Sequence, residues 1–180
     1  IFLEPSSISD EKQFKECLQL ADIFKFSNDR LPQFKDLYPN RQAPIEIETL
    51  GANGLLYRSY KNKTDHWKFL PALQTDNAID TAGAGDWCSA GIIHAMFEDF
   101  ESSTIAGLTI GKLENIFAFG QFLSSVNCNF YGARGLMYNC TYTAIKKMYI
   151  NFLERNKIEV KKKENGFKVN QSPYKFESLL

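Results

Sequence analysis

The sequence has few of the residues that build metal and redox sites. Its 180 residues include four cysteines and two histidines, and no two cysteines form a C-x-x-C pair. A zinc ribbon or a redox dithiol therefore has no support, and a structural metal site is not expected. We interpret the cysteines as reduced, mostly buried thiols of a cytoplasmic protein.

An excess of one charge and a long apolar run are also missing. Lysine plus arginine equals aspartate plus glutamate, at 21 each, so no global field favours nucleic acid or an anionic membrane. No segment approaches about 20 uninterrupted apolar residues, which argues against a membrane span. The first residues do not resemble a secretory signal. The chain begins at Ile1 instead of methionine, so we expect it to be part of something longer.

The composition instead favours a packed α/β domain, with 44% hydrophobic and 14% aromatic residues. Ser9-Asp10 precedes residues that recur at helical spacing as far as Ala21. Residues 22–27 predict a short strand, and residues 31–37 predict a second short helix.

A three-stranded antiparallel segment is predicted next. Residues 44–50 alternate with period two, residues 51–54 form a glycine-rich turn, and residues 55–60 resume the strand pattern. A third strand is expected over residues 64–70, with Trp67 and Phe69 on one face. Only one strand clearly precedes this segment. Because a parallel sheet needs both faces and edges covered, we expect the sheet to be incomplete.

Helices dominate the second half. We expect one helix from Asp86, another from about Ser103 to Val126, and a last one from about Thr141 to Arg155. Residues 132–135 are expected to interrupt the helical pattern between the last two. Residues 156–180 predict a solvated extension. The expected domains are therefore residues 1–155 and a tail at 156–180, and the alternation of strands and helices favours an α/β sheet flanked by helices.

Residues 80–86, with the sequence Asp-Thr-Ala-Gly-Ala-Gly-Asp, mark a strand-to-helix junction. Glycine and alanine let backbone N–H groups approach an anion closely, and the start of the next helix adds a favourable dipole. Such a nest suits a phosphoryl group during its transfer, and Asp86 can accept a proton from an attacking hydroxyl. The alternative is a glycine turn with an N-capping aspartate.

The string from Asp80 to Gly91 resembles the second signature of the PfkB, or ribokinase-like, carbohydrate kinase family. In that family the helix at the position of Gly91 packs closely on its neighbour. Three further segments agree in order: residues 49–54 resemble a T-L-G-x-x-G turn that lines the ATP site, residues 21–27 resemble the strand where that site begins, and residues 132–135 resemble a G-A loop near the nucleotide. Glu4-Pro5 resembles the stretch after the mid-sheet strand.

The resemblance implies a role for each matching residue. Asp86 would be the catalytic base, and the anion hole would consist of the backbone amides of Gly83, Ala84 and Gly85. Contacts to ATP would come from Thr49, Gly51, Gly54, Gly132 and Ala133, with Mg²⁺ and, in members that use it, K⁺ as further cofactors. Asp80 matches a position that helps to coordinate K⁺. The alternatives are that Asp80 locks its loop by hydrogen bonds and that Thr49 satisfies local backbone at a strand end.

The resemblance covers only part of the family's domain. The first half of such kinases supplies the early glycine motif, the acidic sugar-binding residue and a small β lid, and none is found here. We therefore expect a partial Rossmann-like, ribokinase-type sheet without its N-terminal half and lid. Residues 27–30 also depart from the family's N-x-x-E motif, because Arg30 occupies the acidic position tied to magnesium.

Two functions remain open on this basis. The chain is either the ATP-binding, catalytic half of a kinase for a small sugar substrate, or a non-catalytic remnant that serves in oligomerisation or regulation. Its partner would be the missing N-terminal half or a second copy in a homodimer. A different nucleotide-binding α/β domain has little support, because neither G-x-G-x-x-G at a strand–helix junction nor G-x-x-x-x-G-K-[ST] occurs.

Overall fold

A computed structural model of the protein describes residues 1–62, 65–75, 77–98, 105, 108–164 and 175–176. The chain divides into two compact units, and each is described by itself. The sheet unit comprises Ile1–Ala72 with Ser102–Glu114, and the helical unit comprises Leu73–Glu101 with Asn115–Leu180. Within the described residues, no helix is long and apolar enough to cross a membrane.

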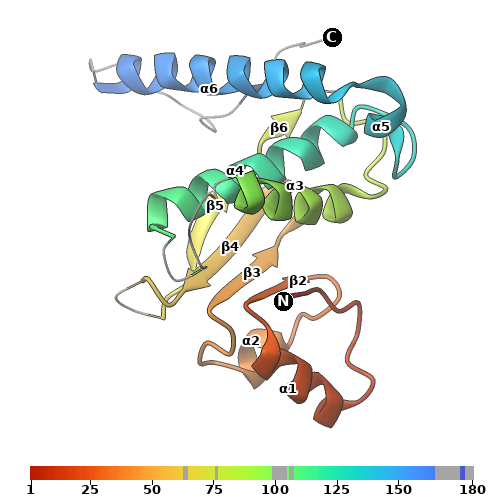
Figure 1. Ribbon diagram of the computed structural model, residues 1–180, viewed down its shortest axis with the longest axis vertical. Coiled ribbons are helices and arrows are strands. Elements are labelled where there is room, and N and C mark those ends of the chain that lie inside the picture. Colours follow the sequence, from red (N-terminus) through yellow and green to blue (C-terminus); the bar gives the residue numbers. More distant parts are fainter. Residues whose placement is uncertain (63–64, 76, 99–104, 106–107, 165–174, 177–180) are drawn as a thin grey trace. The chain divides into compact units, whose positions relative to one another are not determined.

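The sheet unit contains a five-stranded mixed sheet in the order β1-β2-β3-β4-β5 (Figure 1). Its strands are β1 (Phe2–Leu3), β2 (Ile23–Ser27), β3 (Ile45–Thr49), β4 (Gly54–Ser59) and β5 (Lys68–Pro71). The first three strands run parallel, whereas β3–β4 and β4–β5 pair antiparallel. The short 3₁₀ helix η1 (Gly51–Asn53) makes the turn between β3 and β4.

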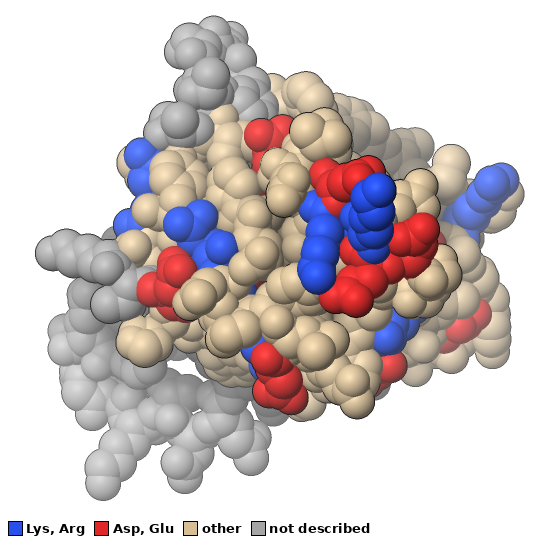
Figure 2. All heavy atoms as spheres, turned by 90° about the horizontal axis from the view of Figure 1, so that it is seen from below, with Lys and Arg blue, Asp and Glu red and all other residues tan. Residues whose placement is uncertain are grey.

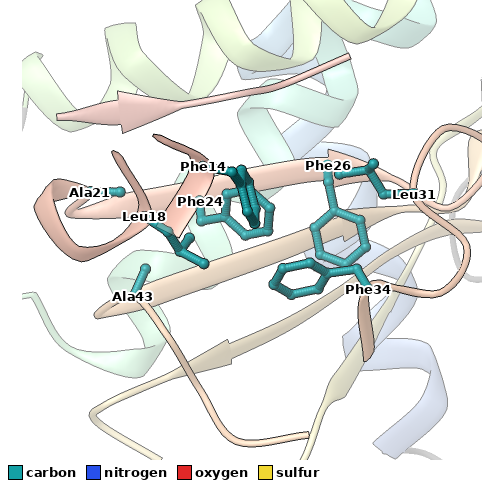
Figure 3. Packing of buried hydrophobic residues seen from close by; sticks show 8 residues of the cluster. All are labelled: Phe14, Leu18, Ala21, Phe24, Phe26, Leu31, Phe34 and Ala43. Atoms are coloured by element: carbon teal, nitrogen blue, oxygen red, sulfur yellow. The ribbon is translucent and has the colours of Figure 1, made fainter. Parts of the chain in front are cut away.

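Two helices and strand β2 contribute most of the core of the sheet unit. Helix α1 (Glu11–Leu20) begins where the Asp10 side chain accepts a hydrogen bond from the Gln13 N–H, 3.0 Å away, so Asp10 caps the helix and the predicted helix start is confirmed. Helix α2 is the short segment Phe34–Leu37. Figure 3 shows the side chains of this core packed against one another, with most of the aromatic rings edge-on or tilted. The cluster consists of Phe14, Leu18, Ala21, Phe24, Phe26, Leu31, Phe34 and Ala43.

A charged pair is buried within the same sheet. Glu46 on β3 lies opposite Arg58 on β4, and both side chains are at most 1% exposed. Arg58 donates to the Glu46 carboxylate at 2.6 Å and to three backbone carbonyls of residues 38–40, at 2.7 to 3.2 Å. Because every charge here has a partner, the pair can be buried without an unsatisfied ion.

Exposed charges of both signs are interspersed on the face shown in Figure 2.

The helical unit is built on α3 (Ala84–Glu98), α4 (Ile110–Asn127) and α6 (Tyr142–Glu164), with the one-turn helix α5 (Gly135–Asn139) between α4 and α6. The two-residue strands β6 (Gln74–Thr75) and β7 (Lys175–Phe176) pair in parallel. Rings of α4 and α6 contact each other, with Phe122 5.0 Å from Tyr149 and 5.8 Å from Phe152 between ring centroids. Gly91 of α3 faces Gly120 of α4 so closely that a Cβ on Gly91 would lie 2.8 Å from the Gly120 Cα. The close packing expected at Gly91 is confirmed.

Most expected elements are present, but several boundaries differ. The third strand begins at Lys68, so Trp67 precedes it; the predicted start at Thr64 lies outside the described residues. Helix α4 begins at Ile110, since Leu108 and Thr109 are not helical, and the predicted start at Ser103 is also outside them. Helix α6 continues past Arg155 to Glu164. Strand β1 lies directly before Glu4-Pro5, where the resemblance places the end of a strand. Helix α5 and strands β6 and β7 were not expected.

Candidate active-site loop

Residues 77–83 connect β6 to α3 and end in a tight turn. Gly83 has φ +73°, a conformation that residues with a Cβ rarely adopt. A Cβ on Gly83 would also lie 2.7 Å from the Ala133 Cα, so this loop touches the turn that carries Gly132 and Ala133. Two of the segments predicted to surround the nucleotide therefore lie together in the helical unit.

The amides predicted to form the anion hole differ in their hydrogen bonds. The Ala84 N–H donates to the Thr81 carbonyl at 3.1 Å. The Gly83 N–H, in contrast, finds no acceptor in the part of the chain that the structure describes. A Cβ on Gly85 would have nothing within 4 Å, so its backbone is open to close approach.

Asp86 lies in the first turn of α3, and its side chain is exposed. Among the described residues, no hydrogen bond or ion pair engages its carboxylate. A carboxylate that is both accessible and unengaged is free to accept a proton from a hydroxyl brought within hydrogen-bond distance.

Asp80 tethers the loop to the neighbouring turn. Its Oδ1 accepts from the Ala82 N–H at 2.9 Å, and its Oδ2 accepts from the Gly132 N–H at 2.8 Å. These two bonds hold the pKa of the Asp80 carboxyl below its ordinary value, and the bond from Ala82 has the larger effect. Both lower the pKa because they stabilise the charged form. Asp80 therefore locks its loop by hydrogen bonds, which was one of the two roles predicted for it. A contact between Asp80 and K⁺ stays a prediction.

Two further side chains bind the same loops, and sequence reasoning missed both. The Trp87 indole N–H donates to the Ala133 carbonyl at 2.8 Å. Asn127, at the end of α4, is fully buried; its amide donates to the Ala82 carbonyl at 3.0 Å and accepts from the Leu136 N–H at 3.1 Å. No local pattern marks Asn127, because α4 contains several other polar residues, such as Gln121 and Ser125.

The other predicted nucleotide contacts lie in the sheet unit, at the turn between β3 and β4. The Thr49 hydroxyl donates to the Phe26 carbonyl at 3.3 Å, as the strand-end alternative proposes. Gly51 has φ +56° and Gly54 has φ +116°. A Cβ on Gly54 would overlap the backbone of β5, whereas one on Gly51 would meet nothing within 4 Å. Glycine is thus required at Gly54 by the adjacent strand.

Residues 27–30, which replace the N-x-x-E motif, form a turn after β2. The Arg30 N–H donates to the Ser27 carbonyl at 3.1 Å, and Asn28, Asp29 and Arg30 are all exposed. Within the residues described, no group of three or more His, Cys, Asp or Glu could hold a metal ion. Any Mg²⁺ would therefore take most of its ligands from elsewhere.

The fold is similar to part of the ribokinase-like fold. The structure is similar to ribokinase from Giardia lamblia, with a TM-score of 0.64 and 17% identity over 84% of this chain and 50% of that chain. It is also similar to the nucleoside kinase of Burkholderia thailandensis in complex with inosine, with a TM-score of 0.62 and 15% identity over 82% of this chain and 46% of that chain.

A third similar structure is aminoimidazole riboside kinase from Salmonella enterica, complexed with aminoimidazole riboside and an ATP analog. Its TM-score is 0.53, with 19% identity over 71% of this chain and 46% of that chain. The chain thus spans about half the length of the solved structures that it matches. A scan against known protein-family models gives no match.

Proposed function

We propose that this chain supplies the nucleotide-binding, base-bearing part of a kinase that transfers the γ-phosphate of ATP to a hydroxyl of a sugar or nucleoside. The observation that carries the proposal is an exposed, unengaged carboxylate at Asp86, in the first turn of α3, three residues after a Gly83 N–H that has no acceptor among the described residues. The fold adds support, because the similar structures are kinases that act on such compounds.

In this proposal Asp86 accepts the proton of the substrate hydroxyl as that oxygen attacks the γ-phosphate. The backbone N–H groups of Gly83, Ala84 and Gly85 stabilise the charge on the transferring group, aided by the positive end of α3. Gly83 offers its N–H directly, whereas the Ala84 N–H would have to share or leave the Thr81 carbonyl. The remaining ATP contacts are assigned to Thr49, Gly51, Gly54, Gly132 and Ala133.

The cations fit this chain to different degrees. Magnesium in kinases keeps several waters and is held largely by substrate phosphates with one or two carboxylates, so a cage of protein ligands is not required. Asp80 would be the ligand of a K⁺ ion. Its two oxygens each accept one backbone N–H, and because a carboxylate offers about four acceptor positions, it retains capacity for a monovalent cation.

The test measures nucleotide binding and phosphoryl transfer separately, in this chain and in the longest reading frame that contains it. Calorimetry with MgATP reports binding, and transfer of labelled γ-phosphate to ribose, fructose or inosine reports catalysis. We expect Asp86→Asn to keep the MgATP affinity while the transfer rate falls by about 10²–10⁴-fold. Asp36→Asn, which alters an exposed acid of α2, is the matched control and should change neither.

Three outcomes distinguish the alternatives. Binding with transfer that depends on Asp86 supports the kinase. Binding with transfer that survives Asp86→Asn refutes the assignment of the base. If neither this chain nor the longer reading frame binds MgATP, the chain is a non-catalytic remnant. Oligomerisation or regulation then becomes the better explanation of its fold.

A further inference from the structure

Asn127 is the one side chain that bridges the candidate anion loop to α5 among the described residues. It is 0% exposed, and its carboxamide bonds to two backbone groups that are far from each other in sequence, the Ala82 carbonyl and the Leu136 N–H. Because Asn127 is buried, losing either bond would leave a buried polar group without a partner, which costs free energy. An amide is also the side chain that donates and accepts at once in a fixed plane.

The bond to Ala82 has a consequence for its neighbour. The Ala82 carbonyl and the Gly83 N–H belong to the same peptide group, and the described residues contain no cis peptide bond. In a planar trans peptide the C=O and N–H bonds point in opposite directions. Since Asn127 holds the carbonyl toward the protein interior, the Gly83 N–H must point away from Asn127.

The peptide on the other side of Ala82 is held as well. Asp80 accepts from the Ala82 N–H, so both peptide groups that flank Ala82 have fixed orientations. Gly83 itself has φ +73° and could otherwise adopt many conformations, because glycine lacks a Cβ. These two bonds therefore orient the Gly83 N–H together with the bond from the Ala84 N–H to the Thr81 carbonyl, which closes the same turn.

We infer that Asn127 is a positioning residue that aims the Gly83 N–H at the γ-phosphate of ATP. The inference rests on the proposed function, because it presupposes an anion at the loop. It adds a residue 45 positions from Ala82 in sequence that touches neither nucleotide nor sugar. A donor held in place before the anion arrives needs no reorganisation during the reaction, and this pre-organisation is the source of its effect.

The experiment compares MgATP with MgADP, because the Gly83 N–H should contact only the phosphate that ADP lacks. Asn127→Asp retains the acceptor for Leu136 but replaces the donor to Ala82 with a repelling oxygen, and Asn127→Ala removes both bonds without adding charge. Asn129→Asp is the matched control. Asn129 lies two residues further on and bonds to Thr75, Ser125 and Val126 instead of the loop.

We expect either Asn127 variant to weaken MgATP binding about tenfold or more, as for a lost hydrogen bond to a charged group, with MgADP affinity changed less than about twofold. Asn129→Asp should leave the ratio of the two affinities unchanged. In the unaltered chain, the amide proton resonance of Gly83 should shift downfield with MgATP and much less with MgADP. Circular dichroism and the dispersion of the amide spectrum establish that each variant is folded.

The results separate the inference from the proposed function. If the unaltered chain binds MgATP but a folded Asn127 variant retains the ratio of affinities, the inference is refuted and the kinase proposal stands. A Gly83 resonance that responds equally to both nucleotides refutes it even if neither variant folds. If the unaltered chain binds neither nucleotide, the proposed function fails, and the anion that Asn127 would serve is absent.

Discussion

The contact between α3 and α4 depends on two glycines, and adding one methyl group to either should separate the helices. A Cβ on Gly120 would lie 2.7 Å from the Cys88 carbonyl oxygen, and one on Gly91 would lie 2.8 Å from the Gly120 Cα. Both obstacles are backbone atoms, so no rotamer change can relieve the overlap. We expect Gly120→Ala to cost about 3 kcal/mol relative to a substitution without overlap, at the upper end of the range for overpacked cores.

Gly111→Ala supplies that reference, because it lies in the same helix and its Cβ would meet nothing within 4 Å. Alanine is favoured over glycine in a helix by up to about 1 kcal/mol, so Gly111→Ala should stabilise the protein slightly. Urea unfolding followed by circular dichroism at 222 nm measures the free energy of unfolding of each variant. Equal stabilities of Gly111→Ala and Gly120→Ala would refute the close approach of α3 and α4.

Two further predictions concern buried and tethered charges. Arg58→Met should lower the free energy of unfolding by about 3–5 kcal/mol, because it leaves the buried Glu46 carboxylate without its cation; the double variant with Glu46→Gln should recover much of this loss, and urea unfolding of both tests it. Asp80→Asn should be less stable than the unaltered chain at pH 7. Because the folded-state pKa of Asp80 is lowered, its stabilisation is complete above its ordinary pKa and is lost as the pH falls through the folded-state pKa. The deficit should therefore vanish in acid, and a deficit that persists there would contradict the tether.

The parts of the fold that follow from local patterns were predictable from the sequence. Period-two alternation and the strand pattern after the glycine-rich turn identified β3 and β4, and the helix start at Ser9-Asp10 identified α1. Strand β1 has two residues, too few for any period, and exists because it pairs with β2. Helix α5 spans five residues, which is also too short for helical periodicity to appear.

The site shows a similar division. The loop with Gly83 and Asp86 was visible because its residues are adjacent in sequence and carry their chemistry themselves. The contacts of Trp87 with Ala133 and of Asn127 with Ala82 join segments about 45 residues apart. Such pairs are created by packing of the helical unit, and a single sequence contains no local signal for them.

The structure also separates the glycines of the loop by what each one indicates. Gly83 is required by the chain itself, because its φ is positive and a Cβ would strike Ala133; a glycine there would be needed even in a protein that binds no anion. Gly85 is different, since it lies in α3 without a positive φ and a Cβ would meet nothing. Alanine would suit that helical position better. A glycine that the fold does not require, directly before an exposed aspartate, is therefore stronger support for a bound phosphate than Gly83 is.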